Sequence, residues 1–168
     1  RNYIIMPFVH RSDLKPYQRD DFDETIAFER WAEHIETSEP PRERNMITLK
    51  LLTALIAVES SGNDSALGDN GNSHGCLQIG WAVVADVNKA RERRGAPAFT
   101  FPKDTYDRTK AKVICREYLN IYCTEKRLGR KPTQQDAARM WNGGPNGHKK
   151  IATEKYWAKV QRELSNIK

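Results

Sequence analysis

Residues 59–79 read ESSGNDSALGDNGNSHGCLQI, and this stretch joins an apolar segment to a polar loop. The apolar segment, residues 46–58, has few polar interruptions, namely Thr48, Lys50 and Thr53. This pattern predicts a buried helix that carries Glu59 in its last turn. Burial disfavours a charged carboxylate, and so does the partial negative charge at a helix C-terminus. Both effects predict a raised pKa for Glu59, which is the property that a general acid needs near neutral pH.

The loop that follows Glu59 is rich in Gly, Asn, Asp and Ser, which favour turns and tolerate positive φ. Asp69 lies in this loop, ten residues after Glu59. Two carboxylates in contrasting surroundings, one at a buried helix end and one in a polar loop, are typical of divided acid and base roles. Taken by itself, Asp69 before Asn-Gly is equally an ordinary turn residue that bonds its own backbone.

Three blocks of sequence occur in the order of a known family. The first is Glu59-Ser60 with GDNGN at 68–72 and GCLQI at 75–79, the second is MWNGGP at 140–145, and the third is YWAKV at 156–160. Together they resemble the goose-type lysozymes and the related lytic transglycosylases. Residues 138–147 also resemble the Asn-Gly-Gly-Pro-Asn-Gly stretch of invertebrate-type lysozymes. The resemblance spans roughly residues 46–162 and does not cover the first forty or so residues.

The resemblance implies a fold. We expect a mainly α (α+β) lysozyme-like fold, in which a substrate cleft lies between a helical lobe and a small lobe. The resemblance also implies that any short β-hairpin lies within residues 63–73.

The resemblance also implies the roles of individual residues. Glu59 corresponds to the catalytic acid and Asp69 to a second catalytic carboxylate. The expected substrate-binding residues are Ser60, Gly75, Gln78, Trp141, Asn142, Gly143 and Tyr156. Among them, Trp141 would form a wall against a sugar, Asn142 would bind an N-acetyl group, and Tyr156 would reach the catalytic acid. From the residues alone, Trp141 and Tyr156 are equally core residues.

The sequence departs from the family at several positions. The usual Gly-Leu-Met-Gln is Gly-Cys-Leu-Gln at 75–78, and Trp141 stands where the family has a Tyr, which replaces a phenol by an indole N–H. Goose-type enzymes have a further Asp where this chain has Gly80. Asp69 is therefore the remaining candidate for a second carboxylate.

Composition fits one globular domain. The 168 residues are 38% hydrophobic, and the formal net charge of +6 gives a pI of about 9.3. Such a charge favours anionic partners, including cell-wall polymers, although mixed-sign stretches such as 89–94 more often mark solvated helix faces. No apolar run reaches the ~18 residues of a membrane helix, and no secretory leader is visible in this chain.

We expect two parts. Residues 1–45 are predicted to form an N-terminal arm and a helix over Asp23–Thr37 that pack on the body, with Pro40-Pro41 as a linker. Residues 46–168 are predicted to form the lysozyme-like catalytic domain. Its further predicted helices cover 78–93 and 105–128, run from Thr133 to about Trp141, and start again at Thr153.

Three cysteines, Cys76, Cys115 and Cys123, give an odd number, so at least one is unpaired within the chain. Cys115 and Cys123 lie on one predicted helix, about 12 Å apart by helical rise, which exceeds the reach of a disulfide unless the helix breaks between them. Cys76 could pair with either, or all three could be reduced and buried. The disulfide-rich framework of invertebrate-type lysozymes is not transferable to this chain.

The expected function is that of a peptidoglycan-cleaving glycosidase, a muramidase that cuts the β-1,4 bond between N-acetylmuramic acid and N-acetylglucosamine. The alternatives are a lytic transglycosylase that forms 1,6-anhydromuramic products, or a non-catalytic wall-binding or virion module. No cofactor or metal is implied. The expected partners are peptidoglycan glycan strands, with no nucleic acid and no membrane span, and the chain is expected to be a monomer unless it belongs to a larger assembly. The expected site of action is the bacterial cell wall, reached from the periplasm, by secretion or by phage delivery.

Overall fold

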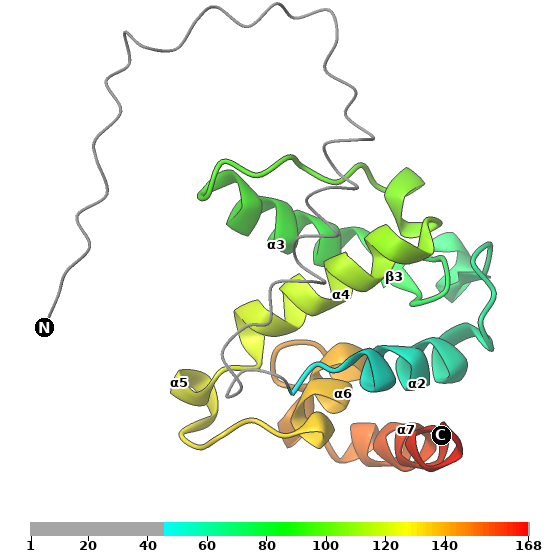
Figure 1. Cartoon of the computed structure of the whole chain (residues 1–168), viewed down its shortest axis with the longest axis vertical. Helices are drawn as coiled ribbons and strands as arrows, with labels where there is room; N and C mark the ends of the chain where they lie inside the picture. Colours follow the sequence, from blue (N-terminus) through cyan, green and yellow to red (C-terminus); the bar gives the residue numbers. More distant parts are fainter. Residues whose placement is uncertain (1–45, 168) are drawn as a thin grey trace, which may run out of the picture. The chain divides into compact units, whose positions relative to one another are not determined.

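The computed structural model describes residues 46–167. Within this range the α-helices are α2 (Leu49–Ser60), α3 (Trp81–Glu92), α4 (Arg108–Tyr122), α5 (Glu125–Leu128), α6 (Gln134–Gly143) and α7 (Glu154–Asn166) (Figure 1). The strands are β1 (Leu67–Gly68), β2 (Ser73–His74) and β3 (Ile79–Gly80). Single-turn 3-10 helices are η3 (Asp69–Gly71), η4 (Lys103–Thr105), η5 (Gly147–Lys149) and η6 (Ile151–Thr153). The described chain is mainly helical with one small sheet, which confirms the predicted fold class.

Some predictions lie outside the described residues. They are the N-terminal arm, the helix over Asp23–Thr37, the Pro40-Pro41 linker and Lys168 at the end of the predicted catalytic domain. Among the residues that are described, no helix is both long enough and apolar enough to cross a membrane.

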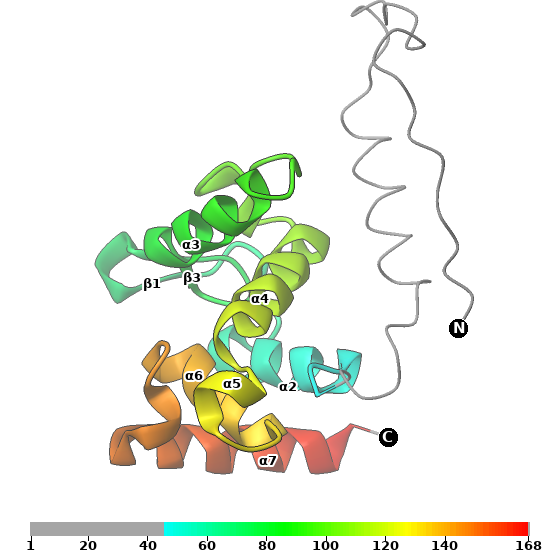
Figure 2. The ribbon, with the colours of Figure 1, turned by 90° about the vertical axis from the view of Figure 1, so that its left-hand side faces the viewer.

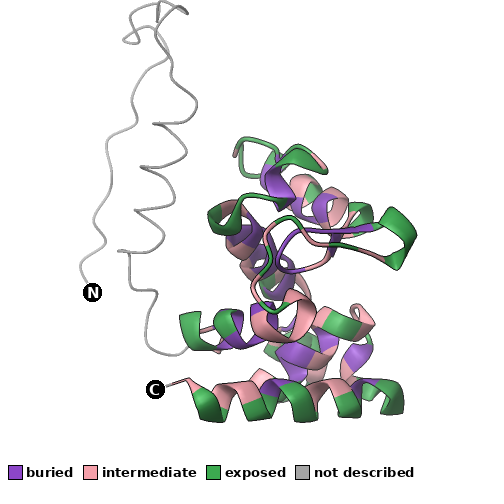
Figure 3. Ribbon diagram, turned by 90° about the vertical axis from the view of Figure 1, so that its right-hand side faces the viewer, coloured by how far each residue is buried: buried purple, intermediate pink, exposed green. Residues whose placement is uncertain are grey.

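The helices and strands form two groups joined by α4. Figure 2 shows α3 and the strands on one side of α4, and α2, α6 and α7 on the other. Helix α4 packs against both α3 and α6, while α2 packs against α7. This arrangement matches the expected division into a small lobe and a helical lobe. Exposed residues predominate along the outer face of α7 (Figure 3). Val160 of this helix is buried.

Helix α2 is the apolar segment that was predicted to carry Glu59. Thr48 caps its start, because the Thr48 side chain accepts a hydrogen bond from the Leu51 amide at 3.1 Å. It ends at Ser61, which adopts the left-handed conformation with φ 54°. The buried residues of this helix are Leu51, Leu52, Ala54, Leu55 and Ile56. Burying this apolar stripe stabilises the helix and fixes Glu59 in its last turn, as predicted.

The sheet lies directly after α2 and has three strands in the order β1-β2-β3, all antiparallel. Leu67 pairs with His74, and His74 pairs with Ile79. The first hairpin falls where the sequence predicted one. The third strand was not predicted, because Ile79–Gly80 was assigned to the start of a helix over 78–93. That helix begins three residues later, at Trp81, since Gln78 has a positive φ of 50° that no helix accommodates.

The prediction of one long helix over 105–128 is wrong, because this segment forms two separate helices, α4 and α5. Asp107 caps α4, with its carboxylate accepting from the amides of Thr109 at 2.9 Å and Lys110 at 3.0 Å. The helix ends at Tyr122, and Thr124 caps the separate short helix α5 by accepting from the Arg127 amide at 3.3 Å. A capping threonine inside an otherwise helical pattern therefore breaks the segment in two.

Helix α6 begins after Thr133, as predicted, and Thr133 forms a capping box with Asp136. It continues to Gly143, two residues beyond the predicted end. Helix α7 begins after Thr153, also as predicted, but the Thr153 hydroxyl does not cap it. That hydroxyl instead donates to carbonyl groups in the preceding turn, at Gly147 and Lys150.

All three cysteines are buried and free, which resolves the alternatives in favour of reduced thiols. Burial raises the pKa of the Cys76 thiol to about 11 and that of Cys123 to about 12. Burial likewise raises the pKa of Cys115 well above its usual range. Protonated, buried thiols are poor nucleophiles, so these residues act as core side chains.

Candidate functional site

Glu59 is half-buried at the end of α2, and its pKa is raised above the usual glutamate value. The largest cause is burial, which disfavours the anion. The negative charge of Asp69 raises the pKa further. A carboxyl that keeps its proton toward neutral pH can act as a general acid.

Two aromatic side chains from the helical lobe contact Glu59. The Tyr156 hydroxyl on α7 donates to Oε1 of Glu59 at 2.7 Å, and the polar edge of Trp141 at the end of α6 also lowers the pKa of Glu59. Both contacts favour the anion and so oppose the effect of burial. Trp141 is itself held edge-on against Tyr118, with ring centroids 5.8 Å apart. The acid is therefore fixed in one orientation by three helices, α2, α6 and α7.

Asp69 lies in η3 between β1 and β2, on the opposite group of elements from Trp141 and Tyr156. It is exposed and adopts a left-handed conformation with φ 48°. Its influence on the pKa of Glu59 places it within electrostatic range of the acid. Because Asp69 is exposed and Glu59 is half-buried, the two carboxylates have the contrasting surroundings that the sequence predicted.

Ser73 was missed by the sequence analysis. Its buried hydroxyl donates to Oδ2 of Asp69 at 2.8 Å, and the Asp69 carbonyl accepts from the Asn72 side chain at 2.9 Å. Within residues 46–167, Oδ1 of Asp69 has no hydrogen bond, so it is open to a water or substrate. The signal for Ser73 was a serine four residues after an Asp across a predicted turn, where side-chain contacts are common.

Two of the predicted substrate-binding residues connect parts of the site. The Ser60 hydroxyl, one residue after Glu59, donates to the Cys76 carbonyl at 2.9 Å and so ties the end of α2 to the loop before β3. The Gln78 side chain donates to the Gly75 carbonyl at 3.0 Å. Both contacts position the site, and the predicted contacts of these residues with substrate stay predictions.

Gly75 has a conformational role that the sequence did not indicate. Its φ is +74°, and a Cβ at this position would lie 1.9 Å from the Thr105 carbonyl oxygen. The backbone of the sheet region can approach η4 this closely only because residue 75 lacks a side chain.

We expect Gly75→Ala to lower the free energy of unfolding by about 3 kcal/mol. Steric overlap with a buried backbone contributes about 1–3 kcal/mol, and the left-handed conformation adds about 1–2 kcal/mol. Urea unfolding followed by circular dichroism measures the change. Gly71→Ala is the matched control, because residue 71 has a similar φ of +89° but open space where a Cβ would be. Equal losses in the two variants would show that overlap with Thr105 contributes nothing.

Asn142 and Gly143 lie beside Trp141 in the last turn of α6. Asn142 is exposed, whereas the Gly143 carbonyl accepts from the Lys150 side chain at 2.6 Å. A Cβ on Gly143 would lie 2.6 Å from Cγ2 of Thr153, so a larger residue would push η6 away. The structure therefore places Trp141, Asn142 and Tyr156 on the Glu59 side, and Gly75, Gln78 and Asp69 in the sheet region.

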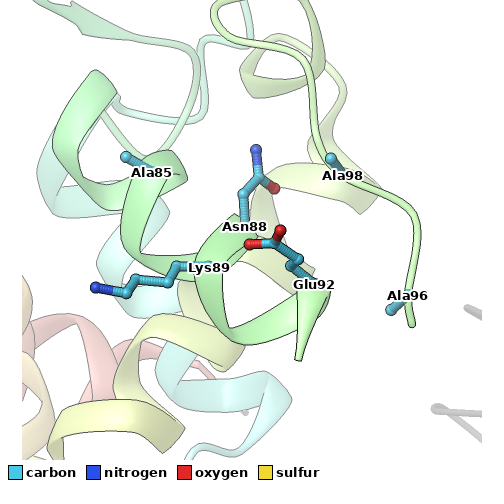
Figure 4. A pocket seen from close by; sticks show the side chains of 6 residues that line it. All are labelled: Ala85, Asn88, Lys89, Glu92, Ala96 and Ala98. Atoms are coloured by element: carbon cyan, nitrogen blue, oxygen red, sulfur yellow. The ribbon is translucent and has the colours of Figure 1, made fainter. Parts of the chain in front are cut away.

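No group of three or more His, Cys, Asp or Glu side chains within residues 46–167 is arranged to hold a metal ion. A surface depression of about 500 Å³ lies elsewhere, on the last turns of α3 (Figure 4). It is lined by Ala85, Asn88, Lys89, Glu92, Ala96 and Ala98, and none of these was a predicted site residue.

Two substitutions should move the pKa of Glu59 in opposite directions. Tyr156→Phe removes a hydrogen bond that favours the anion, so we expect a higher pKa. Asp69→Asn removes a negative charge that disfavours the anion, so we expect a lower pKa. A pH titration of the Glu59 carboxyl carbon by NMR measures both, with Glu154→Gln as a control that removes an exposed carboxylate from α7. Shifts in the same direction would contradict this electrostatic arrangement.

No protein-family model matches the chain, and no curated protein matches its sequence. Solved structures do match. Two of them are 25% identical to this chain, each with a TM-score of 0.58. One is a chain in the crystal structure of Aeromonas hydrophila PliI in complex with Meretrix lusoria lysozyme, and the other is a chain in a structure of inhibitor-bound Meretrix lusoria lysozyme. Tapes japonica lysozyme is 26% identical with a TM-score of 0.57. Each match covers 70% of this chain and 90% of the other.

These matches support a lysozyme-like fold and do not single out the goose-type lysozymes among its members. With the half-buried acid Glu59 held against Tyr156 and near Asp69, they suggest a lysozyme-like glycosidase.

Proposed function

We propose that this protein is a muramidase, which cleaves the β-1,4 bond between N-acetylmuramic acid and N-acetylglucosamine in peptidoglycan. The observation that carries the proposal is the environment of Glu59. Burial raises its pKa, and the Tyr156 hydroxyl fixes its orientation at 2.7 Å. These are the properties of a proton donor to a glycosidic oxygen.

The proposed reaction uses both carboxylates. Glu59 gives its proton to the bridging oxygen, and the bond between this oxygen and C1 of the muramic acid breaks. A water held by Asp69 on the opposite face of the sugar forms the new bond to C1, and Asp69 takes the proton that this water loses. Attack from the opposite face inverts the configuration at C1.

The contacts of Asp69 support the role of a base. Ser73 holds one carboxylate oxygen at 2.8 Å and leaves the other open to solvent. This geometry favours a water-activating carboxylate over a turn residue whose side chain bonds only its own backbone. Trp141, which interacts with Glu59, is proposed to contact the sugar ring, and Asn142, the next residue of α6, to contact its N-acetyl group.

The site of action that follows from this proposal is the bacterial cell wall. Glycan strands of peptidoglycan are then the partner, and the basic character of the chain, with a net charge of +6, favours approach to an anionic wall.

Mass spectrometry of the products tests the proposal. Purified peptidoglycan is incubated with the wild-type protein and, in parallel, with Asp69→Asn. We expect fragments with a reducing muramic end from the wild type and much less product from the variant. Products with a 1,6-anhydromuramic end, unaffected by Asp69→Asn, would instead establish a lytic transglycosylase, in which the muramic 6-hydroxyl attacks in place of water. Binding to the wall without any released fragment would leave the non-catalytic module as the function.

A further inference from the structure

Trp81, the first residue of α3, has an unusually exposed side chain. It is 67% exposed, although tryptophan is the largest side chain and is usually covered for most of its surface. Within residues 46–167, no aromatic ring, cation or hydrogen-bond acceptor contacts its indole. The indole is therefore available to a ligand.

The backbone of Trp81 is fixed close to Asp69. It follows β3 directly, and Gly80 of β3 pairs with Ser73 of β2, whose hydroxyl holds Asp69 at 2.8 Å. A Cβ on Gly80 would lie 3.5 Å from the Asn72 carbonyl oxygen, so the turn that carries Asp69 and the start of α3 approach each other. Figure 2 shows the first turn of α3 beside the β1–β2 hairpin.

The position of Trp81 is also rigid. Val84 and Val87 of α3 are buried, so the helix is anchored immediately after its first turn. An aromatic side chain on an anchored helix offers a large contact area and loses little conformational entropy on binding. An exposed aromatic side chain on an anchored helix is suited to a flat ligand with one apolar face.

Such a ligand follows from the proposed function, on which this inference rests. The ring of a β-1,4-linked N-acetylhexosamine has a face of C–H groups that can stack on an indole, while its hydroxyl and amide groups stay in water. We propose that Trp81 is a binding platform for a sugar of the glycan strand, beyond the two sugars whose shared bond is cleaved. The cleavage point is then set by Glu59 and Asp69, and Trp81 adds affinity and a requirement for longer strands.

Binding of a defined oligosaccharide tests this inference. The probe is the β-1,4-linked hexamer of N-acetylglucosamine, and the host is Glu59→Gln, which should not cleave it. In this host we expect Trp81→Ala to weaken binding about tenfold by calorimetry, and Trp81→Phe to weaken it much less because a ring remains. The dimer of N-acetylglucosamine should bind equally with and without Trp81.

Leu49→Ala is the matched control, because Leu49 is also a large exposed apolar residue, 58% exposed, but lies at the far end of α2 from Glu59. Thermal unfolding checks that each variant is folded. Hexamer binding that is unchanged by Trp81→Ala, or weakened equally by Leu49→Ala, would overturn the platform.

The same experiment separates this inference from the proposed function. If the wild type cleaves nothing while hexamer binding still depends on Trp81, the catalytic proposal fails and the platform stands. If the wild type cleaves the hexamer and Trp81→Ala does not weaken hexamer binding, the platform fails and the muramidase proposal stands. No binding of the hexamer by any variant would overturn the platform, while the peptidoglycan assay still decides on the muramidase.

Discussion

Glu59→Gln should lower kcat for peptidoglycan cleavage by about 10²–10⁴-fold, the usual contribution of a positioned general acid. Glutamine has nearly the shape of the protonated glutamate and can still accept the hydrogen bond from Tyr156, but it has no acidic proton to give. We therefore expect binding to glycan to be retained. The release of reducing ends is measured at saturating peptidoglycan with both proteins at equal concentration, and it gives the ratio of the two kcat values. Activity within threefold of the wild type would exclude Glu59 as the acid.

The stability of Glu59→Gln relative to the wild type should also depend on pH. Because the pKa of Glu59 is raised in the folded protein, its ionised form destabilises the fold. Wild-type stability should decline as pH rises from the unfolded-state pKa through the folded-state pKa. Glutamine does not ionise, so the unfolding temperature of Glu59→Gln should exceed that of the wild type by more as pH rises across this window. A difference independent of pH would show that Glu59 has an ordinary pKa.

Glu117→Gln should lower the free energy of unfolding by about 3 kcal/mol, because it removes a charge that compensates a fully buried guanidinium. Arg91 of α3 donates from Nη1 to Oε1 of Glu117 on α4 at 2.6 Å, and its guanidinium lies 4.2 Å from the centre of the Phe99 ring. Burial lowers the pKa of Arg91, and the charge of Glu117 opposes this. Without Glu117 the buried cation loses this counter-charge, and α3 loses one of its polar links to α4.

Arg94→Gln is the control for this prediction. Arg94 forms an ion pair with the other carboxylate oxygen of Glu117, with Nη2 and Oε2 also 2.6 Å apart, but its side chain is 49% exposed. Solvent screens such a pair, so we expect a loss of at most about 1 kcal/mol. Urea unfolding of the wild type and both variants at one pH and salt concentration measures the loss of unfolding free energy in each variant. Equal losses would mean that burial of Arg91 does not govern the energetics of this cluster.

The local elements near the acid were determined largely by the sequence. An apolar run of residues 46–58 predicts α2 with Glu59 in its last turn, and a Gly- and Asn-rich loop predicts the turns that follow. The hairpin in this loop was expected from the family resemblance. Thr133 predicts the start of α6 because its side chain can satisfy free amides of the first turn. These features depend on residues close together in the chain, so the sequence contains nearly all the information that they need.

Other features depended on contacts between distant segments. The third strand at Ile79–Gly80 exists because β2 offers it a pairing partner, although its residues are compatible with a helix. The role of Gly75 follows from the approach of the Thr105 backbone, and the link from Ser73 to Asp69 follows from the register of β2. The contact of Gly75 with Thr105 could not be placed from spacing alone, because the two residues are thirty positions apart.

The sequence by itself determined the mainly helical class, the acid at the end of a buried helix and the residues that resemble a lysozyme site. The tertiary structure decided that Tyr156, 97 residues after Glu59, donates to that acid, and that Asp69 lies within its electrostatic range. The physical reason is that a pKa depends on burial and on neighbouring charges, and both arise only when α2, α6, α7 and the sheet are packed together.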